Sequence, residues 1–311
     1  MGGHTIEYGS SGSYDWRRDV SITRVTSVDY SIKDKREYTG NESKGIPAPK
    51  GKEISTDSKL AEILVVDVTG SMGKWPGLIF QRIPTLYSEA NVAMQGLSLD
   101  DLAAGKIKPE DVLELCVIAI GDAKHDRQPL QVVDFSKGGE LVKGINDIYP
   151  EAGGGPFGCE SYELVAHYLD RHCKTPNAAG KPVLIWACDE DFYEKIEPSQ
   201  VEALIGDKIG QPLDSSEVMA KLKDRFDMYV LRPEPEGQCA QYARAQKHWE
   251  NILGAQRVFR MQKPERLVDC IIQVSAMASG NYDLGKDLLE RRQTPEQVKD
   301  VLDSIVKPKE E

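Results

Sequence analysis

Short apolar runs alternate with amphipathic segments from residue 59 onward. The runs 63–66, 113–120 and 183–188 carry apolar residues at nearly consecutive positions, which is typical of strands that are covered on both faces. Between such runs, apolar residues recur at helical spacing, as they do over residues 160–173. This alternation predicts an α/β fold of the doubly wound, Rossmann-like kind, with a mostly parallel six-stranded sheet and helices on both faces.

The rest of the pattern fits the same architecture. We expect further strands over 130–135, 226–231 and 257–261, and further helices over 75–95, around 141–145 and 218–222, over 239–253 and around 267–272. The last helix has the clearest start signal of all. Thr294 is its expected N-cap, Pro295 its first residue and Gln297 the partner of Thr294 in a capping box.

These patterns divide the chain into three parts. Residues 1–58 form an N-terminal arm that we expect to be partly flexible, residues 59–278 form the α/β domain, and residues 279–311 form a C-terminal helical extension. Within the arm, residues 21–32 alternate weakly, as a hairpin or an edge strand does. Two interpretations of this segment stay open. It is either a mobile tail or an arm that docks on its own domain or on a neighbour.

Composition narrows the class of protein further. The 311 residues include 39 Lys and Arg against 50 Asp and Glu, a net charge of −11, which excludes a general affinity for nucleic acid. No apolar run is long enough for a membrane helix or a signal peptide, so we expect a cytoplasmic protein without a membrane partner. The six cysteines include no C-x-x-C pair, which argues against a disulfide framework and a zinc site.

Oxygen-bearing side chains follow two of the expected strands. Asp67, Thr69 and Ser71 alternate after the first strand, so that a tight turn can direct all three side chains at one point. Asp189 follows another strand, and ligands of open parallel sheets gather where strands end. Carboxylates and hydroxyls are hard ligands that suit Mg²⁺ or Mn²⁺. Taken alone, the first three residues also fit a capped turn at the start of the next helix.

The sequence D-x-T-x-S after an apolar strand, followed by Met72 and Gly73, resembles the metal-ion-dependent adhesion site of von Willebrand factor type A (VWA) domains. The resemblance covers about residues 59–278 and is closest to the hemicentin and alpha-kinase-linked subclass. Its further counterparts are Gly121-Asp122, Asp134-Phe135-Ser136, Gly153-Gly154-Gly155 with Glu160, and Cys188-Asp189. It implies that Thr69 and Ser71 ligate the metal directly while Asp67 and Asp189 hold its waters.

Two departures from the family pattern concern the remaining ligands. The threonine that integrin-type domains supply from the second loop is absent, and Pro156 stands where an Asp usually follows the three glycines. The metal ligand that this threonine would supply could instead be Glu160, Ser161 or a water. Asp122 is expected to support the site or its turn rather than to bind the metal.

We also expect Lys74, Trp75 and Glu190 at the rim that meets a partner, although Trp75 equally fits a position beneath the first loop. Asp191, next to Glu190, is expected to be solvated. The acidic rim itself should repel an acidic partner unless a cation is bound.

The resemblance implies a protein-interaction module rather than an enzyme, with a partner's Asp or Glu completing the coordination of the metal. Enzyme motifs are incomplete: Thr69 stands where haloacid-dehalogenase phosphatases need a second Asp, and no phosphate-binding loop is present. Two alternatives stay open. One is a self-assembling structural protein with a vestigial metal site, and the other is a VWA adaptor of a MoxR-type AAA+ ATPase.

Overall fold

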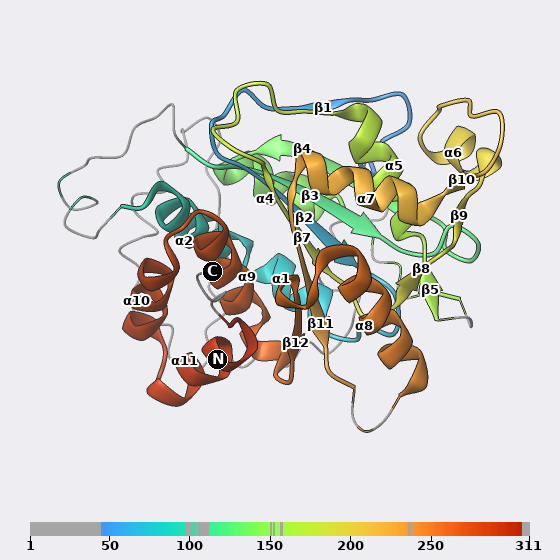
Figure 1. Cartoon of the computed structure of the whole chain (residues 1–311). Helices are drawn as coiled ribbons and strands as arrows, with labels where there is room; N and C mark the ends of the chain where they lie inside the picture. Colours follow the sequence, from blue (N-terminus) through green and yellow to red (C-terminus); the bar gives the residue numbers. More distant parts are fainter. Residues whose placement is uncertain are drawn as a thin grey trace, which may run out of the picture.

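The computed structural model describes residues 45–97, 101, 104, 112–149, 151, 153–155, 158–235, 237 and 239–306. The hairpin or edge strand expected over residues 21–32 lies outside this part. Six strands form the central sheet, in the order β12-β11-β7-β2-β3-β4 (Figure 1). In chain order they are β2 (Ala61–Asp67), β3 (Glu114–Ile120), β4 (Leu130–Ser136), β7 (Val183–Ala187), β11 (Asp227–Pro233) and β12 (Val258–Met261).

The prediction of a mostly parallel, six-stranded, doubly wound sheet is confirmed. All neighbouring strands are parallel except β4, which runs antiparallel to β3 at one edge. The loop from β3 to β4 is too short for a helical crossover, so the chain turns back as a hairpin there. Cys116 and Cys188 are buried, as their apolar surroundings predict.

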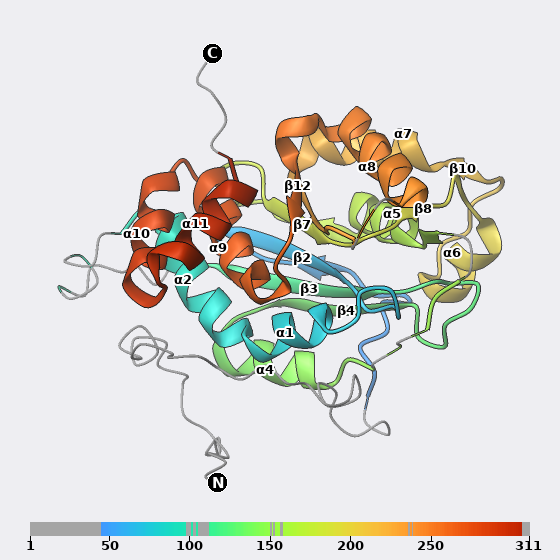
Figure 2. The same cartoon turned by 90° about the horizontal axis from the view of Figure 1, so that it is seen from below.

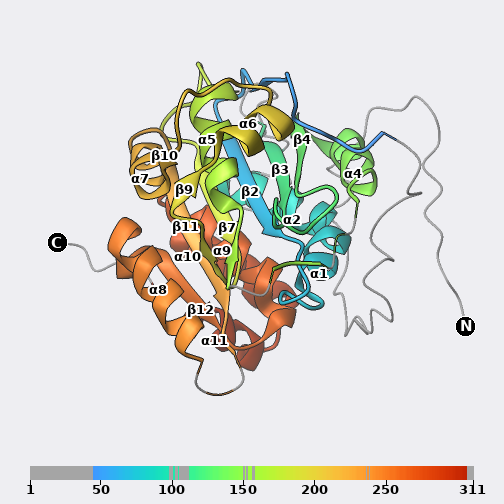
Figure 3. The ribbon, with the colours of Figure 1, turned by 90° about the vertical axis from the view of Figure 1, so that its right-hand side faces the viewer.

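Two layers of helices cover the sheet, and Figures 2 and 3 show the sheet between them. One layer contains α1 (Trp75–Gln81), α2 (Ile83–Gln95), α4 (Gly138–Asn146), α9 (Leu267–Ala278), α10 (Tyr282–Arg292) and α11 (Pro295–Ser304). The other contains α5 (Tyr162–His172), α6 (Pro198–Leu204), α7 (Ser215–Arg225) and α8 (Ala240–Leu253). Alternate residues of β2 face opposite layers: Leu64 and Val66 lie in the first core, Ile63 and Val65 in the second.

The expected helix over 75–95 is two helices that meet at Arg82. The backbone N–H of Arg82 bonds to the carbonyl of Ile79, which ends α1. Pro84 then stands in the first turn of α2, where its missing N–H costs no intrahelical bond. The capping box of α11 is confirmed, since Thr294 and Gln297 bond to each other's backbone N–H.

Three two-stranded pairings lie around the central sheet. They are β1 (Ile54–Ser55) with β6 (Cys173–Lys174), β5 (Cys159–Glu160) with β8 (Asp191–Phe192), and β9 (Lys195–Ile196) with β10 (Leu213–Asp214). The pairing of β5 with β8 matters for the site, because it fixes Glu160 beside the segment that follows β7.

Candidate metal centre

The turn after β2 arranges three of the predicted ligands. Asp67 is the last residue of β2 and is fully buried. Its Oδ1 accepts hydrogen bonds from the backbone N–H of Thr69 at 2.7 Å and from the Thr69 hydroxyl at 2.6 Å. Thr69 Oγ1 in turn lies 3.1 Å from Ser71 Oγ. The alternating spacing therefore directs all three side chains to one side of the turn.

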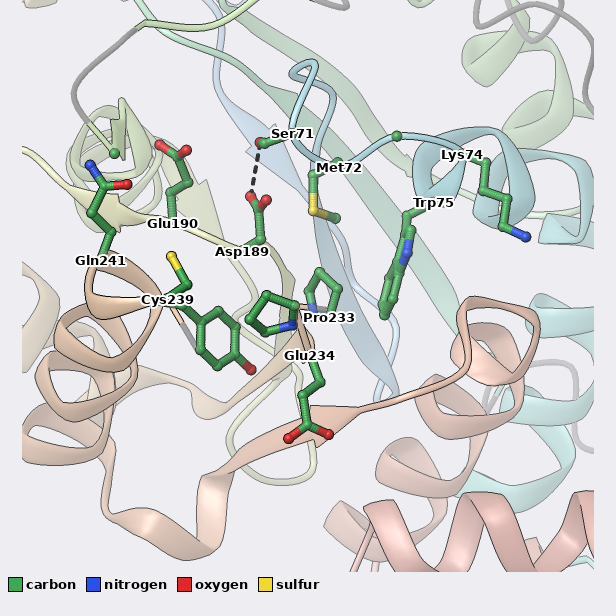
Figure 4. Close-up of a pocket in the computed structure, with 14 residues that line it drawn as sticks. Ser71, Met72, Lys74, Trp75, Asp189, Glu190, Pro233, Glu234, Cys239 and Gln241 are labelled. Atoms are coloured by element: carbon green, nitrogen blue, oxygen red, sulfur yellow. Dashed lines mark hydrogen bonds between the residues drawn. The ribbon is translucent and has the colours of Figure 1, made fainter. Parts of the chain in front are cut away.

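Asp189 joins this group from the neighbouring strand. β7 pairs with β2, with Ala187 opposite Val66, so the segments after both strands lie side by side. Ser71 Oγ donates to Asp189 Oδ1 at 3.2 Å (Figure 4). The four predicted ligands thus lie in one group: Thr69 donates to Asp67, Ser71 donates to Asp189, and the two hydroxyl oxygens are 3.1 Å apart.

Ionisation of the Asp67 and Asp189 carboxyl groups is disfavoured. Burial raises the pKa of Asp67 well above its usual value, and the nearby Asp189 raises it further. Burial also raises the pKa of Asp189. The Tyr162 hydroxyl donates a short hydrogen bond to Asp67 Oδ2, and the charge of Arg232 lowers the pKa of Asp189, but neither outweighs burial. Ionisation of both carboxylates together would therefore require an added positive charge.

Glu160 is the strongest candidate for the metal ligand that replaces the missing second-loop threonine. It lies in β5, just before α5, and its side chain is buried. Glu160 Oε2 has no hydrogen-bond partner. Burial, followed by the charge of Asp67 and other carboxylates, raises the pKa of Glu160 to about 10. Gly154, at a φ of +113°, passes so close that an added Cβ would lie 2.9 Å from Glu160 Oε1 and 3.3 Å from Thr69 Cβ.

Ser161 and Asp122 instead hold the loop after β3. Ser161 Oγ accepts the backbone N–H of Ala123 at 2.9 Å. Asp122 Oδ1 accepts the N–H of Lys124 at 2.9 Å, and its Oδ2 faces the His125 ring and the Tyr193 hydroxyl. Both side chains are buried and engaged, which leaves Glu160 rather than Ser161 facing Thr69.

The three rim residues differ in exposure. Lys74 is exposed, Glu190 is partly buried, and Trp75 is only 7% exposed, beneath the first loop. All three line a hollow of about 460 Å³ that also contacts Ser71 and Asp189 (Figure 4). Asp191 is not solvated as expected: it is buried in β8, which pairs with β5, and His248 Nδ1 lies 2.7 Å from its Oδ1.

Sequence reasoning missed Tyr162 and Asp126. Tyr162, at the start of α5, donates a hydrogen bond to Asp67 Oδ2, the carboxyl oxygen that Thr69 does not contact. Asp126 accepts the N–H of Asp122 at 2.7 Å and that of Gly154 at 3.0 Å, which joins the second loop to the glycine segment. No local pattern marks the contacts of Tyr162 with Asp67 and of Asp126 with Gly154, because each joins segments that are distant in sequence.

Two negative findings concern the described residues. No group of three or more His, Cys, Asp and Glu side chains there is placed to hold a metal ion. A metal at the candidate centre would therefore depend on the hydroxyls of Thr69 and Ser71 as well as on carboxylates. Among the same residues, no helix has the length and apolar character that a membrane span needs.

Comparison with known proteins yields weak structural similarities only. No family model matches the sequence, and no curated protein matches it. Proximal thread matrix protein 1 from the mussel byssus has a TM-score of 0.43 at 13% identity, over 73% of this chain and 47% of that one. The pilus adhesin SpaC from Lactobacillus rhamnosus GG has a TM-score of 0.46 at 12% identity, over 79% and 33%.

A vWF domain is among these similar structures. That of the type V pili tip protein Mfa5 from Porphyromonas gingivalis has a TM-score of 0.39 at 9% identity, over 77% of this chain and 98% of that one. The present chain thus spans about half of the mussel protein and a third of SpaC. Similarities this low define neither the family nor the function of the chain.

Proposed function

We propose that this protein is a divalent-cation-dependent protein-interaction module of the VWA type. Mg²⁺, or Mn²⁺, would be held at the carboxyl edge of the sheet, where an Asp or Glu of a protein partner completes its coordination. The observation that carries the proposal is the convergence of the oxygen atoms of Asp67, Thr69, Ser71 and Asp189, each within 2.6–3.2 Å of the next, where two neighbouring strands end.

The chemistry of these residues fits a hard dication. Thr69 and Ser71 would bind it directly, and Asp67 and Asp189 would hold its waters, as suits an ion that dehydrates reluctantly. Asp67, Asp189 and Glu160 have raised pKa values, and no ion pair within the described residues includes them. A dication would offset their mutual repulsion and offer a partner's carboxylate a charged, partly dehydrated contact.

The direct test is calorimetric titration of the protein with Mg²⁺ and with Mn²⁺. Asp67→Asn should abolish the binding of both ions, whereas Asp303→Asn, at an exposed position in α11, should bind like the wild type. Circular dichroism of both variants checks that the fold is intact. Equal binding by Asp67→Asn and the wild type would refute the metal site.

We further place the module in a reducing compartment such as the cytoplasm, and we propose no catalytic role for it. All six cysteines are free, which supports a reducing compartment. Catalysis by the metal would need a general base beside an activated water. Asp122, a carboxylate that could serve as such a base, instead binds the Lys124 N–H in the loop after β3 and the Tyr193 hydroxyl.

A further inference from the structure

Arg232 lies near the end of β11 and is fully buried beside the candidate metal centre. β11 pairs with β7, and just after the paired residues the N–H of Cys188 donates to the carbonyl of Leu231 at 3.2 Å. One residue further along each segment, Arg232 Nη2 donates a short hydrogen bond to the carbonyl of Asp189. A side chain thus holds the backbone of a predicted ligand at the point where the strand pairing ends.

The other arm of the guanidinium group binds α8. Arg232 Nη1 donates to the carbonyl of Tyr242 and to Gln246 Oε1, both at 3.1 Å. Gln246 Nε2 donates in turn to Glu250 Oε1 at 2.8 Å, which fixes the orientation of the Gln246 amide. Arg232 therefore joins α8, which lies beside β11 in Figure 1, to the segment that carries Asp189.

α8 holds the same segment at a second point. Trp249 Nε1 donates to the carbonyl of Glu190 at 3.3 Å. The consecutive carbonyls of Asp189 and Glu190 are therefore both bound by side chains that α8 contains or holds. A backbone fixed at two successive residues leaves the Asp189 carboxyl group few positions other than the one in which it accepts from Ser71.

The chemistry of this link explains why an arginine stands there. Its acceptors are two backbone carbonyls and one side-chain amide, so among the described residues no bonded carboxylate neutralises the buried guanidinium group. Its charge acts instead on the rim: burial raises the pKa values of Asp189 and Glu190, and Arg232 offsets part of each rise. The planar fork of an arginine reaches both segments at once, which the point charge of a lysine does not.

We propose that Arg232 is a positioning residue of the candidate metal centre: by anchoring the Asp189 backbone to α8, it holds the Asp189 carboxyl group where the cation binds. This inference rests on the proposed function, since it assigns a role within the same site. It adds to the site a residue that the D-x-T-x-S pattern does not contain and that acts on the ion through Asp189.

The test is calorimetric titration of the full-length protein with Mg²⁺. Arg232→Lys keeps the positive charge but loses the fork, so it should lower the Mg²⁺ affinity about tenfold. Asp189→Ala should also lower the affinity. Adding Arg232→Lys to Asp189→Ala should cause little further loss, because the carboxyl group that Arg232 positions is already gone.

Arg257→Lys is the matched control. Arg257 also donates to a backbone carbonyl, that of Met228 at 3.2 Å, and lies over a tyrosine ring, but it does so beside the opposite end of β11. Arg257→Lys should therefore bind Mg²⁺ like the wild type, even if it loses stability.

Amide hydrogen exchange of the metal-free protein provides a second readout. In Arg232→Lys, exchange over residues 188–191 should rise about tenfold, while exchange over residues 64–67 of β2 should stay as in the wild type. Gln246→Ala removes one acceptor of the guanidinium group and leaves the bond to Asp189 in place. It should show the same two changes, in affinity and in exchange, to a smaller extent.

The outcomes separate this inference from the proposed function. If Arg232→Lys binds Mg²⁺ as tightly as the wild type, or loses as much affinity in the Asp189→Ala protein as in the wild type, the role of Arg232 is overturned while the metal site stands. If Arg232→Lys does not fold, the same comparisons with Gln246→Ala decide. If the wild type does not bind Mg²⁺, the proposed function fails, and this inference fails with it.

Discussion

Ser71 Oγ donates a hydrogen bond to Asp189 Oδ1 at 3.2 Å, and this bond links the loops that follow β2 and β7. The two loops are adjacent because their strands are paired, with Val66 opposite Ala187. The pairing of the two strands thus brings the candidate ligands together. A site held by a rigid sheet is well suited to bind a cation with little reorganisation.

Replacing Ser71 by alanine tests this arrangement at its most accessible ligand. We expect Ser71→Ala to lower the Mg²⁺ affinity by at least about tenfold, because one direct ligand is lost. The side chain is exposed, so the free energy of unfolding without metal should change by less than about 0.5 kcal/mol. Calorimetric titration and urea unfolding measure the two effects, with Ser199→Ala, at an exposed position in α6, as a control for serine removal. An unchanged Mg²⁺ affinity would remove Ser71 from the site.

Glu160 and Ser161 give a second, paired prediction. Glu160→Gln should weaken Mg²⁺ binding several-fold, since Glu160 Oε1 and Thr69 both lie against Gly154 and Glu160 Oε2 has no hydrogen-bond partner. Ser161→Ala should instead leave Mg²⁺ affinity unchanged and cost about 1 kcal/mol of stability, because the N–H of Ala123 loses its acceptor. Titration and urea unfolding of both variants decide the assignment. If Ser161→Ala weakens Mg²⁺ binding and Glu160→Gln does not, the additional metal ligand is Ser161.

Much of the fold could be predicted because its signals are local. Apolar runs such as Ile63–Val66 can be buried only between two helix layers, and the capping box at Thr294 fixes where α11 begins. The break at Arg82 was missed because α1 and α2 have continuous helical periodicity across it. The antiparallel direction of β4 follows from loop length, a weaker signal than the strand pattern itself.

The candidate site was predictable only where its residues follow strands. Asp67 and Asp189 could be grouped because parallel strands end at one edge. The burial of Asp191 depends on His248, and the charge state of Asp67 depends on Tyr162, and both partners come from helices distant in sequence. Side-chain contacts of this kind are set by tertiary packing and leave no local pattern.

Glu62 provides a pH-dependent prediction away from the site. It is fully buried in β2, and burial raises its pKa to about 7, although the nearby Ser275 hydroxyl offsets part of this effect. Its pKa in the unfolded chain is near 4.5. Between these values the folded state binds the extra proton, so stability falls as the pH rises from about 4.5 to about 7.

Glu62→Gln removes this effect, because an amide does not ionise. At pH 8 the variant should be more stable than the wild type by up to about 3 kcal/mol, and at pH 4 the two should be similar. Urea unfolding at both pH values measures the difference. Glu202→Gln, at an exposed position, should show no such pH dependence. A constant difference between Glu62→Gln and the wild type at both pH values would contradict this account.

Asp269 holds α9 to its neighbours through three arginines. Its side chain is fully buried, with Oδ1 3.0 Å from Arg82 Nη2, Oδ2 3.0 Å from Arg266 Nη1, and a short bond from Arg292 of α10. Burial alone would raise the pKa of Asp269, but the charges of Arg292, Arg82 and Arg266 outweigh it and lower the pKa. Stability from this cluster is therefore present above the unfolded-state pKa and lost as the pH falls through the lower folded-state pKa.

Asp269→Asn should be strongly destabilising, by about 3–5 kcal/mol, because it removes the carboxylate charge that three largely buried guanidinium groups share. The matched control is Asp300→Asn, which breaks the more exposed pair with Lys263 at 2.7 Å and should cost less than about 1 kcal/mol. Urea unfolding at pH 7 compares the two variants. Since α9 and α10 are joined at this point, Asp269→Asn should also increase amide hydrogen exchange in both helices. Equal losses of stability in the two variants would show that the buried arginines find other partners, and would rule out Asp269 as the link between the extension and the sheet domain.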